Sequence, residues 1–550
     1  MLHTAKVSLN KRSILYYKEH IMDNLFTLLI VLIYAALMVT IGIVTSKRTR
    51  SVDDFVFGGN KIGPWMTAFG FGTAYFSAVV FIGYAGQFGW SYGISAALID
   101  VGNAVVGATL AWAVLGKRTR LMTKHLEAKT MPDFFEKRYG SKALKTAAAL
   151  IVFLFLIPYT ASVYNGLSRL FAMAFNVQSD HAYEIMIICM ALLSAVYVVL
   201  GGYSATAIND FIQGIIMLIG ISCVVGCIIN YQGGLSEAID KLAAISDKSV
   251  PQGSLASLLG PDPLNLLGVV LLTSLGTWGL PQMVHKFYAI RNEKDITRGM
   301  VISTVFCLIV SGGCYLIGGF GRLYCTLNPD GDGNKAIIKI LTNGKPEFDA
   351  IVPSMLEVAL PSLLIGLVVV LVLSASLSTL SALVLTSSTT MAHDLIRPAC
   401  KGKLSDKNEF TIMRVLIAVF LLISVLVALN KNASISALMS YSWGALSGSF
   451  LGPFIWGLYG KRTTKAAVWV SFGIGITLTL SHMIIFSFFP QQCSEIVKWA
   501  ASLPLNLASP INAGAVLMLL SIIVTPIVSL FTKPCDQKTV DNAFSALKQS

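Results

Sequence analysis

The sequence predicts an all-α membrane protein that crosses the bilayer about thirteen times. Hydrophobic residues make up 55% of its 550 residues and charged residues only 13%, whereas roughly a quarter of a typical soluble domain is charged. The mean hydropathy is +0.71. Apolar runs long enough to span a bilayer recur along the whole chain. The predicted spans are 24–46, 64–86, 92–116, 147–175, 183–200, 206–230, 264–284, 299–320, 362–391, 411–429, 434–458, 465–488 and 510–531.

Basic residues cluster in alternate connections between these spans, and the net charge is +13. In a membrane protein this excess marks cytoplasmic loops and does not call for a nucleic-acid partner. We therefore expect a bacterial-type inner (plasma) membrane, with the N-terminus outside and the C-terminus in the cytoplasm. The basic connections are Lys47/Arg48/Arg50, Lys117/Arg118/Arg120 to Lys145, Lys286/Arg291/Lys294/Arg298, Arg397/Lys401/Lys403/Lys407, Lys461/Arg462/Lys465 and the C-terminal tail.

Three parts of the chain are expected: an N-terminal tail 1–21, one transmembrane domain 22–532 and a cytoplasmic tail 533–550. The N-terminal tail disagrees with the orientation rule, because its basic residues would lie outside. Met22 comes directly before Asp23 and the first span, so it is an alternative start of translation.

The sequence does not predict an enzyme. The sequence contains no HExxH, GxxxxGK[ST] or GxSxG motif, and its longest non-spanning pieces, 231–263 and 321–361, are too short for a catalytic domain. The nine cysteines are scattered without a CxxC pair. Only Cys325 and Cys493 lie in expected external loops, and the sequence leaves their pairing open.

A polar stripe runs along the apolar stretch from Leu371 to Leu395. Ser374, Ser378 and Ser381 recur at helical spacing with Thr379 beside them, and no charged residue precedes His393. Uncharged hydroxyls, helped by carbonyls freed where a helix loosens, can bind a weakly charged ion. The alternative is helix packing, which small hydroxylated residues also favour in membranes.

Two spans are predicted to be interrupted. The second span carries Gly70, Gly72, Gly83 and Gly86, and the seventh carries Gly276, Gly279 and Pro281. They lie five spans apart, and a five-span unit repeated in tandem must be inverted in the membrane. Paired interruptions of this kind indicate a binding site near the midplane, although glycine is common in membrane helices in any case. In span eleven, Gly444, Gly448 and Gly452 predict tight helix packing.

Ionisable residues inside spans are costly and therefore candidates for function. Asp210, after Gly201-Gly-Tyr-Ser-Ala-Thr-Ala-Ile-Asn, could be either a solvated cap or an ion relay. Asp100 lies within span three with Asn103 one turn later. The two could act in function or form an intramembrane polar pair that is satisfied within the bundle.

These stretches together resemble the sodium:solute symporter family over essentially the whole chain. The resemblance implies a LeuT-type inverted repeat of spans 2–6 and 7–11, with one helix before it and two after. Within the family, the chain is similar to the bacterial proline and pantothenate carriers. The motifs are Asp54-Phe-Val-Phe-Gly-Gly-Asn-Lys-Ile-Gly-Pro-Trp, Gly201-Gly-Tyr-Ser-Ala-Thr-Ala-Ile-Asn-Asp-Phe-Ile-Gln, Ser376-Leu-Ser-Thr-Leu-Ser with Met391-Ala-His-Asp-Leu, and Tyr441-Ser-Trp-Gly-Ala-Leu-Ser-Gly-Ser-Phe-Leu-Gly-Pro.

The resemblance also implies a sodium site between spans two and nine. Its ligands would be the backbone carbonyls of Thr73, Phe76 and Ala375 and the hydroxyls of Ser378 and Thr379. Some family members hold a second sodium ion, for which Asp210 and Ser381 match the pattern. Ala382 departs from that pattern and leaves the second ion in doubt.

On the solute side, the residues implied to line the site are Tyr75, Ser77, Thr273, Thr277 and Trp278. Thr273 and Thr277 stand where proline carriers have aromatic residues, and Tyr75 stands at an acidic position. The lost stacking surface and charge disfavour proline. The pattern Gly-Leu-Pro-Gln at 279–282 is nearer to the pantothenate-type members, which take organic anions.

The expected function is sodium-coupled import of a small organic solute, an organic acid or an amino-acid-like compound, by alternating access. An ion or solute channel, or a transporter-like membrane sensor, is the alternative. The expected partners are sodium, the solute and the lipid bilayer, and the sequence leaves the oligomeric state and the sodium stoichiometry open.

Overall fold

The computed structural model describes residues 25–47, 51–60, 62–175, 180–246, 250–326, 338–339, 341–342, 345–400, 404–429 and 434–547. The N-terminal tail 1–21 and the alternative start at Met22 lie outside the described residues. Strands are confined to short pairs in the loop before α14 (Ile351–Ala359): β1 Cys325–Thr326 with β2 Ile338–Lys339, and β3 Leu341–Thr342 with β4 Lys345–Pro346.

Helices occupy every predicted span. Nine described helices are long and apolar enough to cross a membrane, or ten if one bent pair counts as a single span. The predicted number is larger because α3 is only half a span, Tyr183–Val196 of α9 is too short to count, and α18 is not among the nine. The helices are Leu25–Ser46, α3 Pro64–Tyr75, η2 Val79–Tyr84, α4 Ala85–Tyr92, α5 Ala97–Gly102, η4 Asn103–Leu110, η5 Trp112–Gly116, α6 Lys117–His125, α8 Lys142–Ala174, α9 Asp180–Tyr231, α11 Pro263–Gly279, α12 Pro281–Ala289, α13 Lys294–Gly319, α15 Ser362–Thr390, α17 Asp406–Ala428, α18 Ile435–Tyr459, α19 Lys465–Met483 and α21 Pro510–Phe531.

Spans five and six are separated by a single residue, Gly202. Its φ of 55° and ψ of −147° are not helical, and they lie where only glycine is unstrained. A Cβ at this position would also lie 2.4 Å from Cδ2 of Phe55. The break falls between the predicted spans 183–200 and 206–230.

Both predicted interruptions are present. The second span stops at Tyr75 and continues from Val79, with Phe76 in an extended conformation. The seventh span stops at Gly279 and bends by 47° at Leu280 before α12. The glycines of α3 have another role, because Gly72 allows the ring of Phe306 to approach to 2.3 Å from where a Cβ would stand.

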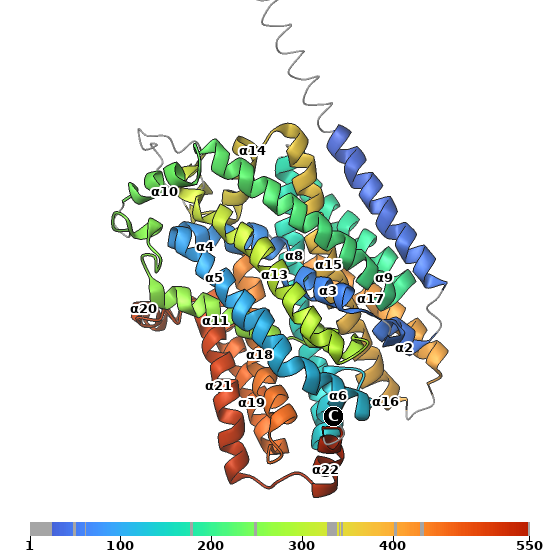
Figure 1. Cartoon of the computed structure of the whole chain (residues 1–550). Helices are drawn as coiled ribbons and strands as arrows, with labels where there is room; N and C mark the ends of the chain where they lie inside the picture. Colours follow the sequence, from blue (N-terminus) through green and yellow to red (C-terminus); the bar gives the residue numbers. More distant parts are fainter. Residues whose placement is uncertain are drawn as a thin grey trace, which may run out of the picture.

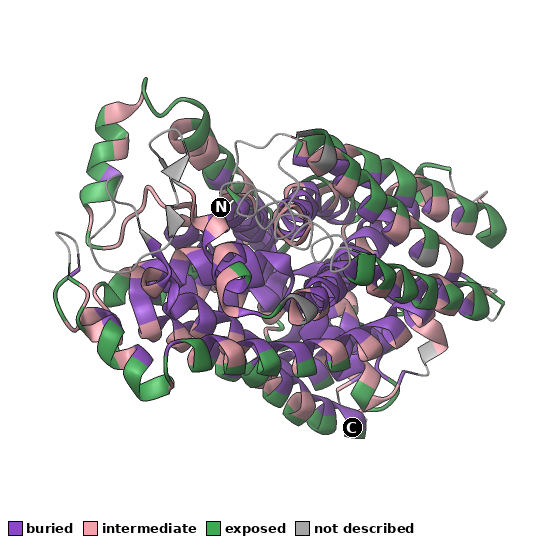
Figure 2. Ribbon diagram, turned by 90° about the horizontal axis from the view of Figure 1, so that it is seen from above, coloured by how far each residue is buried: buried purple, intermediate pink, exposed green. Residues whose placement is uncertain are grey.

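The helix α15 lies at the centre of the bundle. It packs against α3, α8, α9, α12 and α17 (Figure 1), and 94% of its most apolar window is buried. Seen from above, a buried centre is surrounded by helices whose outer faces are exposed (Figure 2). Many of these outer side chains are large and apolar, such as Leu422 and Leu426 of α17, as expected for a surface that faces lipid.

The predicted tight packing of span eleven is confirmed. At Gly452 a Cβ would lie 1.9 Å from the carbonyl oxygen of Ser521 in α21, and at Gly444 it would lie 3.2 Å from Cα of Gly514. The backbones of α18 and α21 therefore lie in close contact, which at Gly452 only glycine permits.

The connections divide between two ends of the bundle. The helices α10 (Leu235–Ala243) and α14 lie at one end, and α2 (Val52–Phe57), α6, α16 (Arg397–Ala399) and α22 (Gln537–Ser545) lie at the other (Figure 1). The basic connections thus gather at the end that holds α22. The remaining short helices are α7 (Met131–Tyr139) and α20 (Ser494–Ser502).

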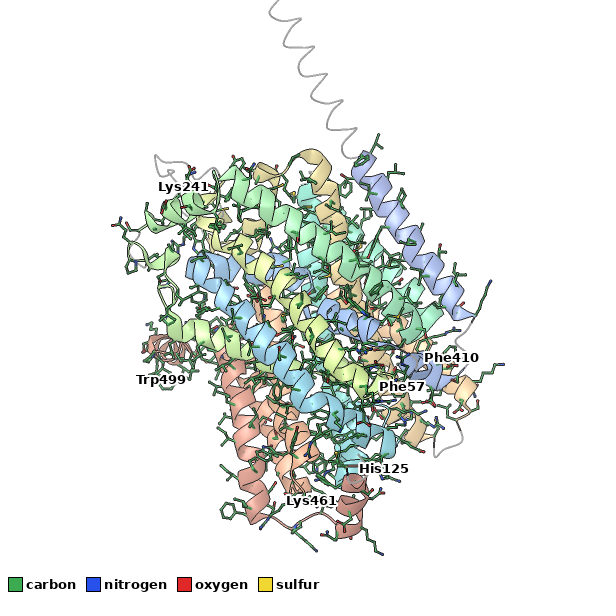
Figure 3. All side chains as sticks on the ribbon, in the orientation of Figure 1. Phe57, His125, Lys241, Phe410, Lys461 and Trp499 are labelled. Carbon is green, nitrogen blue, oxygen red and sulfur yellow. The ribbon has the colours of Figure 1, made fainter. Side chains whose placement is uncertain are left out.

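The C-terminal tail packs onto that end through α22. Phe544 is buried and lies 4.9 Å from the guanidinium carbon of Arg138 in α7. His125 and Lys461 lie beside the same helix (Figure 3).

Candidate functional site

The polar stripe of α15 meets the last turn of α3 immediately before its break. The hydroxyl oxygen of Ser378 lies 2.7 Å from the hydroxyl oxygen of Thr73. The hydroxyl oxygen of Thr379 lies 3.3 Å from the carbonyl of Thr73 and 3.4 Å from that of Ala74. These carbonyls belong to the last turn of α3. The helix stops there, so it provides no further N–H groups to bond to them. All of these side chains are buried.

Four of the five predicted ion ligands therefore come together. Thr379 Oγ1 also lies 3.1 Å from the carbonyl of Ala375, which adds a third carbonyl to the group. Phe76 lies at the break itself, but within the described part of the chain no contact joins its carbonyl to the other oxygens. The carbonyl of Ala74 was not predicted. A group of neutral oxygens suits a monovalent cation that must bind and then leave.

Asp210 reaches this group through Ser378. Its Oδ1 accepts from the Ser378 hydroxyl at 2.7 Å, and its side chain is 1% exposed. The reading of Asp210 as a solvated cap is therefore wrong. Ser381 does not join it, since its hydroxyl donates to the carbonyl of Ser378 at 2.8 Å within the same helix. The predicted Asp210–Ser381 pair is not formed in this conformation.

The second oxygen of Asp210 is held by Lys286. The ammonium nitrogen lies 3.1 Å from Oδ2, and the lysine side chain is 4% exposed. The placement of Lys286 in a basic cytoplasmic connection is wrong, because α12 continues after the 47° bend at Leu280 and Lys286 is buried within it. The sequence could have indicated that Lys286 lies in a helix and not in a basic loop, since it is the only charged residue between Pro281 and Arg291.

Three residues of span seven that were predicted to line a solute site bond to neighbouring spans, two of them to span three and one to span two. The Thr277 hydroxyl donates to the carbonyl of Gly107 and the Trp278 indole donates to that of Val106, both at 3.0 Å. The carbonyl of Thr273 accepts from the hydroxyl of Tyr75 at 2.6 Å. Ser77 acts as a local cap, because its hydroxyl accepts from the backbone N–H of Val79 at 3.2 Å.

An aromatic cluster at the break was missed by the sequence analysis. The rings of Tyr75 and Phe76 stack at 4.4 Å between centroids. Trp443 of α18 lies 6.2 Å from Tyr75 and 5.9 Å from Tyr159 of α8. The Tyr159 hydroxyl and the Trp443 indole nitrogen are buried beside each other. The aromatic cluster (Tyr75, Phe76, Tyr159 and Trp443) therefore combines ring surface with two polar groups that face each other.

Asp100 and Asn103 do not pair with each other. Asn103 lies 2.9 Å from the Tyr75 hydroxyl and accepts from Ser274 at 3.3 Å. Asp100 faces α13, where a Cβ on Gly312 would lie 2.8 Å from its Oδ2. Its Oδ1 has no hydrogen-bond partner among the described residues. Asn103 thus belongs to the network around Tyr75, while Asp100 stays a candidate for function in its own right.

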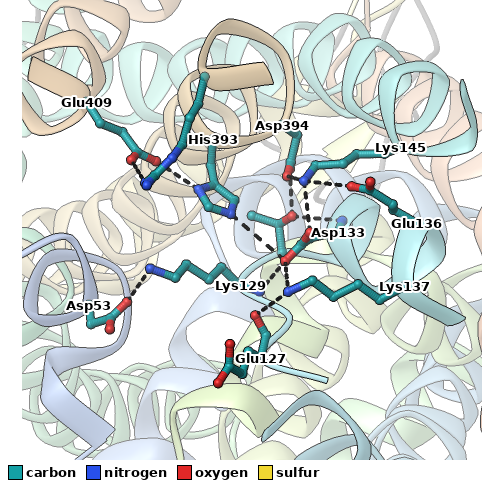
Figure 4. Close-up of polar contacts among 12 residues, drawn as sticks. Asp53, Glu127, Lys129, Asp133, Glu136, Lys137, Lys145, His393, Asp394 and Glu409 are labelled. Carbon is teal, nitrogen blue, oxygen red and sulfur yellow. Dashed lines mark hydrogen bonds and ion pairs between the residues drawn. The ribbon is translucent and has the colours of Figure 1, made fainter. Parts of the chain in front are cut away.

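A charge cluster lies where α7, α8 and α17 meet the residues that follow the C-terminal end of α15 (Figure 4). Lys145 contacts Asp133 at 2.8 Å and Asp394 at 3.4 Å, and His393 contacts Glu409 at 2.8 Å. Burial alone would raise the pKa of Asp133, but the charges of Lys145 and Lys137 outweigh it and lower the pKa. Asp133, His393 and Asp394 could approach a metal ion, but the Lys145 ammonium is already paired with both carboxylates and the Lys137 ammonium with Asp133.

Known proteins resemble the chain over most of its length. The profile of the sodium:solute symporter family matches residues 55–475. The osmoregulated proline transporter OpuE of Bacillus subtilis is 28% identical over 451 residues, which cover 82% of this chain and 87% of that protein. A sodium/proline symporter of Salmonella typhimurium is 27% identical over 431 residues, or 77% of this chain and 80% of that protein.

A solved structure shares the fold. A Na⁺-coupled sialic acid symporter in a substrate-bound outward-open state superposes with a TM-score of 0.69 at 17% identity, over 93% of this chain and 99% of that one. The molecule is thus a multi-pass membrane transporter with a LeuT-type fold and not an enzyme. The chain belongs to the sodium:solute symporter family.

Proposed function

We propose that this chain is a sodium-coupled symporter that imports a small amino-acid-like solute, with proline as the first candidate. The observation that carries the proposal is the meeting of Ser378 and Thr379 with the carbonyls of Thr73 and Ala74 at the helix break. Sodium bound there would link α15 to the broken span. It would thereby favour one orientation of the site, which the solute then closes.

The aromatic cluster supports an amino-acid-like solute with an apolar ring. Proline was disfavoured because Thr273 and Thr277 replace aromatic residues in the seventh span. The structure supplies that surface from other spans, through Tyr159 and Trp443. The named activities of both proline-transporting relatives point the same way.

A small cavity lies between α12 and the C-terminal part of α15. Its walls include Thr386 and Thr389 of α15 and Pro281 and His285 of α12. The basic connections gather at the end that holds α22, so we place that end in the cytoplasm of a bacterial inner membrane. Residue 25 would then lie at the outer face (Figure 1).

The size of the driving force suits such a carrier. One charge moving inward through ~100 mV releases about 2.3 kcal/mol. A tenfold sodium gradient adds roughly 1.4 kcal/mol. Together these could concentrate a neutral solute roughly 500-fold for each coupled ion.

The test is uptake into proteoliposomes that contain the purified protein. Labelled L-proline should accumulate under an inward sodium gradient with the interior negative, and it should not accumulate when potassium replaces sodium. Counterflow of labelled proline without any gradient should also occur, since a carrier exchanges solute while a channel or a sensor does not.

Two results would count against the proposal. Accumulation of pantothenate but not proline would preserve sodium symport and overturn the amino-acid-like solute. Sodium-independent flux, without counterflow for either compound, would overturn symport itself.

A further inference from the structure

The carboxylate of Asp210 is fully occupied in this structure. Oδ1 accepts from Ser378 and Oδ2 is paired with Lys286. The Lys286 ammonium also lies 5.3 Å from the ring centroid of Tyr203, which adds a cation–π contact. At Gly70 of α3, a Cβ would lie 3.0 Å from both Asp210 Oδ2 and Lys286 Nζ. The backbone of the broken span therefore packs directly on the ion pair.

This pair stands where a second cation would have to bind. A buried carboxylate needs a positive partner, and a lysine ammonium provides the same single charge as a sodium ion. Ser381 is turned to the carbonyl of Ser378, and Ala382 has no oxygen in its side chain. Asp210 thus has one cation beside it, and that cation is part of the chain.

We propose that Lys286 is a tethered cation that takes the place of a second sodium ion at Asp210, so that this chain binds one sodium ion. The proposal rests on the proposed sodium-coupled function. The ammonium neutralises Asp210 through every step, and only the ion at Thr379 has to be taken up and released.

The Asp210–Lys286 ion pair also joins the two five-span units. Asp210 belongs to α9, the last helix of the first five-span unit, and Lys286 belongs to α12, in the broken first span of the second unit. The ion pair therefore ties the two units together beside the sodium site. A free sodium ion at Asp210 would neutralise the carboxylate but would leave α12 untied.

The test counts sodium ions and needs no solute. Binding of ²²Na⁺ to the purified protein is measured by scintillation proximity, together with the sodium dependence of thermal unfolding. We expect one ion per chain for the wild type and two for Lys286→Gln, with the Hill coefficient rising from 1 towards 2. Lys286→Arg keeps the charge and should bind one ion. Lys286→Gln combined with Asp210→Asn removes both charges and should also bind one.

The outcomes separate the two proposals. No sodium binding by the wild type would overturn the proposed sodium-coupled function. One ion per chain in both the wild type and Lys286→Gln would overturn the tethered-cation proposal alone, as would two ions in the wild type. A Lys286→Gln protein that unfolds at every sodium concentration, while the double variant folds, would make Lys286 a structural counter-ion that sodium fails to replace, and would also overturn it.

Discussion

Replacing Gly318 with alanine is expected to prevent the chain from reaching a stable fold. Gly318 lies where α13 crosses α4, and a Cβ there would stand 1.9 Å from the carbonyl oxygen of Ala85. A Cβ on Gly89 would stand 1.9 Å from the carbonyl carbon of Gly318. Both obstacles are backbone atoms of packed helices, so no side chain can move aside to make room. We expect a loss of about 3 kcal/mol or more.

The measurement is the yield of monodisperse protein after solubilisation, with the midpoint of thermal unfolding. Gly473→Ala in α19 is the matched control, because nothing lies within 4 Å of a Cβ there. Its yield should equal that of the wild type or exceed it, since alanine favours a helix over glycine by about 1 kcal/mol. Equal yields of the two variants would show that the backbones of α4 and α13 are farther apart than these distances indicate.

Asp210→Asn is expected to destabilise the protein by roughly 3–5 kcal/mol and to abolish transport. The change leaves the ammonium of Lys286 buried without a counter-charge and weakens the acceptor of Ser378. It should therefore lower the midpoint of thermal unfolding at all sodium concentrations. Lys286→Gln should behave differently, because sodium can restore its stability.

The control is a pair of the same charges on the surface. Glu237 and Lys241 form an ion pair in α10 with side chains 56% and 41% exposed, and such pairs contribute less than about 1 kcal/mol. Glu237→Gln should leave both stability and transport near the wild-type values. If the Asp210→Asn protein were as stable as this control, the buried Asp210–Lys286 ion pair would not make the contribution expected here.

The sequence contained enough to predict the spans and the face of α15 that carries the site. The stripe that carries Ser378 and Thr379 was predicted because uncharged hydroxyls on one helical face stand out in an apolar span, whereas their role as ligands was implied by the family resemblance. The boundary between spans five and six was predicted from the apolar runs on either side of it. Both predictions rest on residues that lie close together in the sequence.

The features that the sequence did not predict depend on which spans face one another. Lys286 was assigned to a loop because the predicted seventh span ended at residue 284, before this charged residue, whereas α12 runs to Ala289. Tyr159 and Trp443 lie in spans four and eleven, whose contact no periodicity reveals. Thr277 and Trp278 were assigned to the solute site, and the structure gives their donors to backbone carbonyls of span three.

The most direct test of the sodium site is the sodium concentration that gives half-maximal thermal stabilisation. It would be compared among the wild type, Ser378→Ala, Thr379→Ala and Ser374→Ala. Ser374 lies one turn from Ser378 on the same stripe but outside the group of oxygens at the break. Alanine is tolerated in a helix, so these changes should spare the fold. Loss of one ligand should raise the half-saturating concentration about tenfold or more for Ser378→Ala and Thr379→Ala. Ser374→Ala should change it less than about twofold. An equal response of all three variants would mean that the stripe only packs helices and that sodium binds elsewhere.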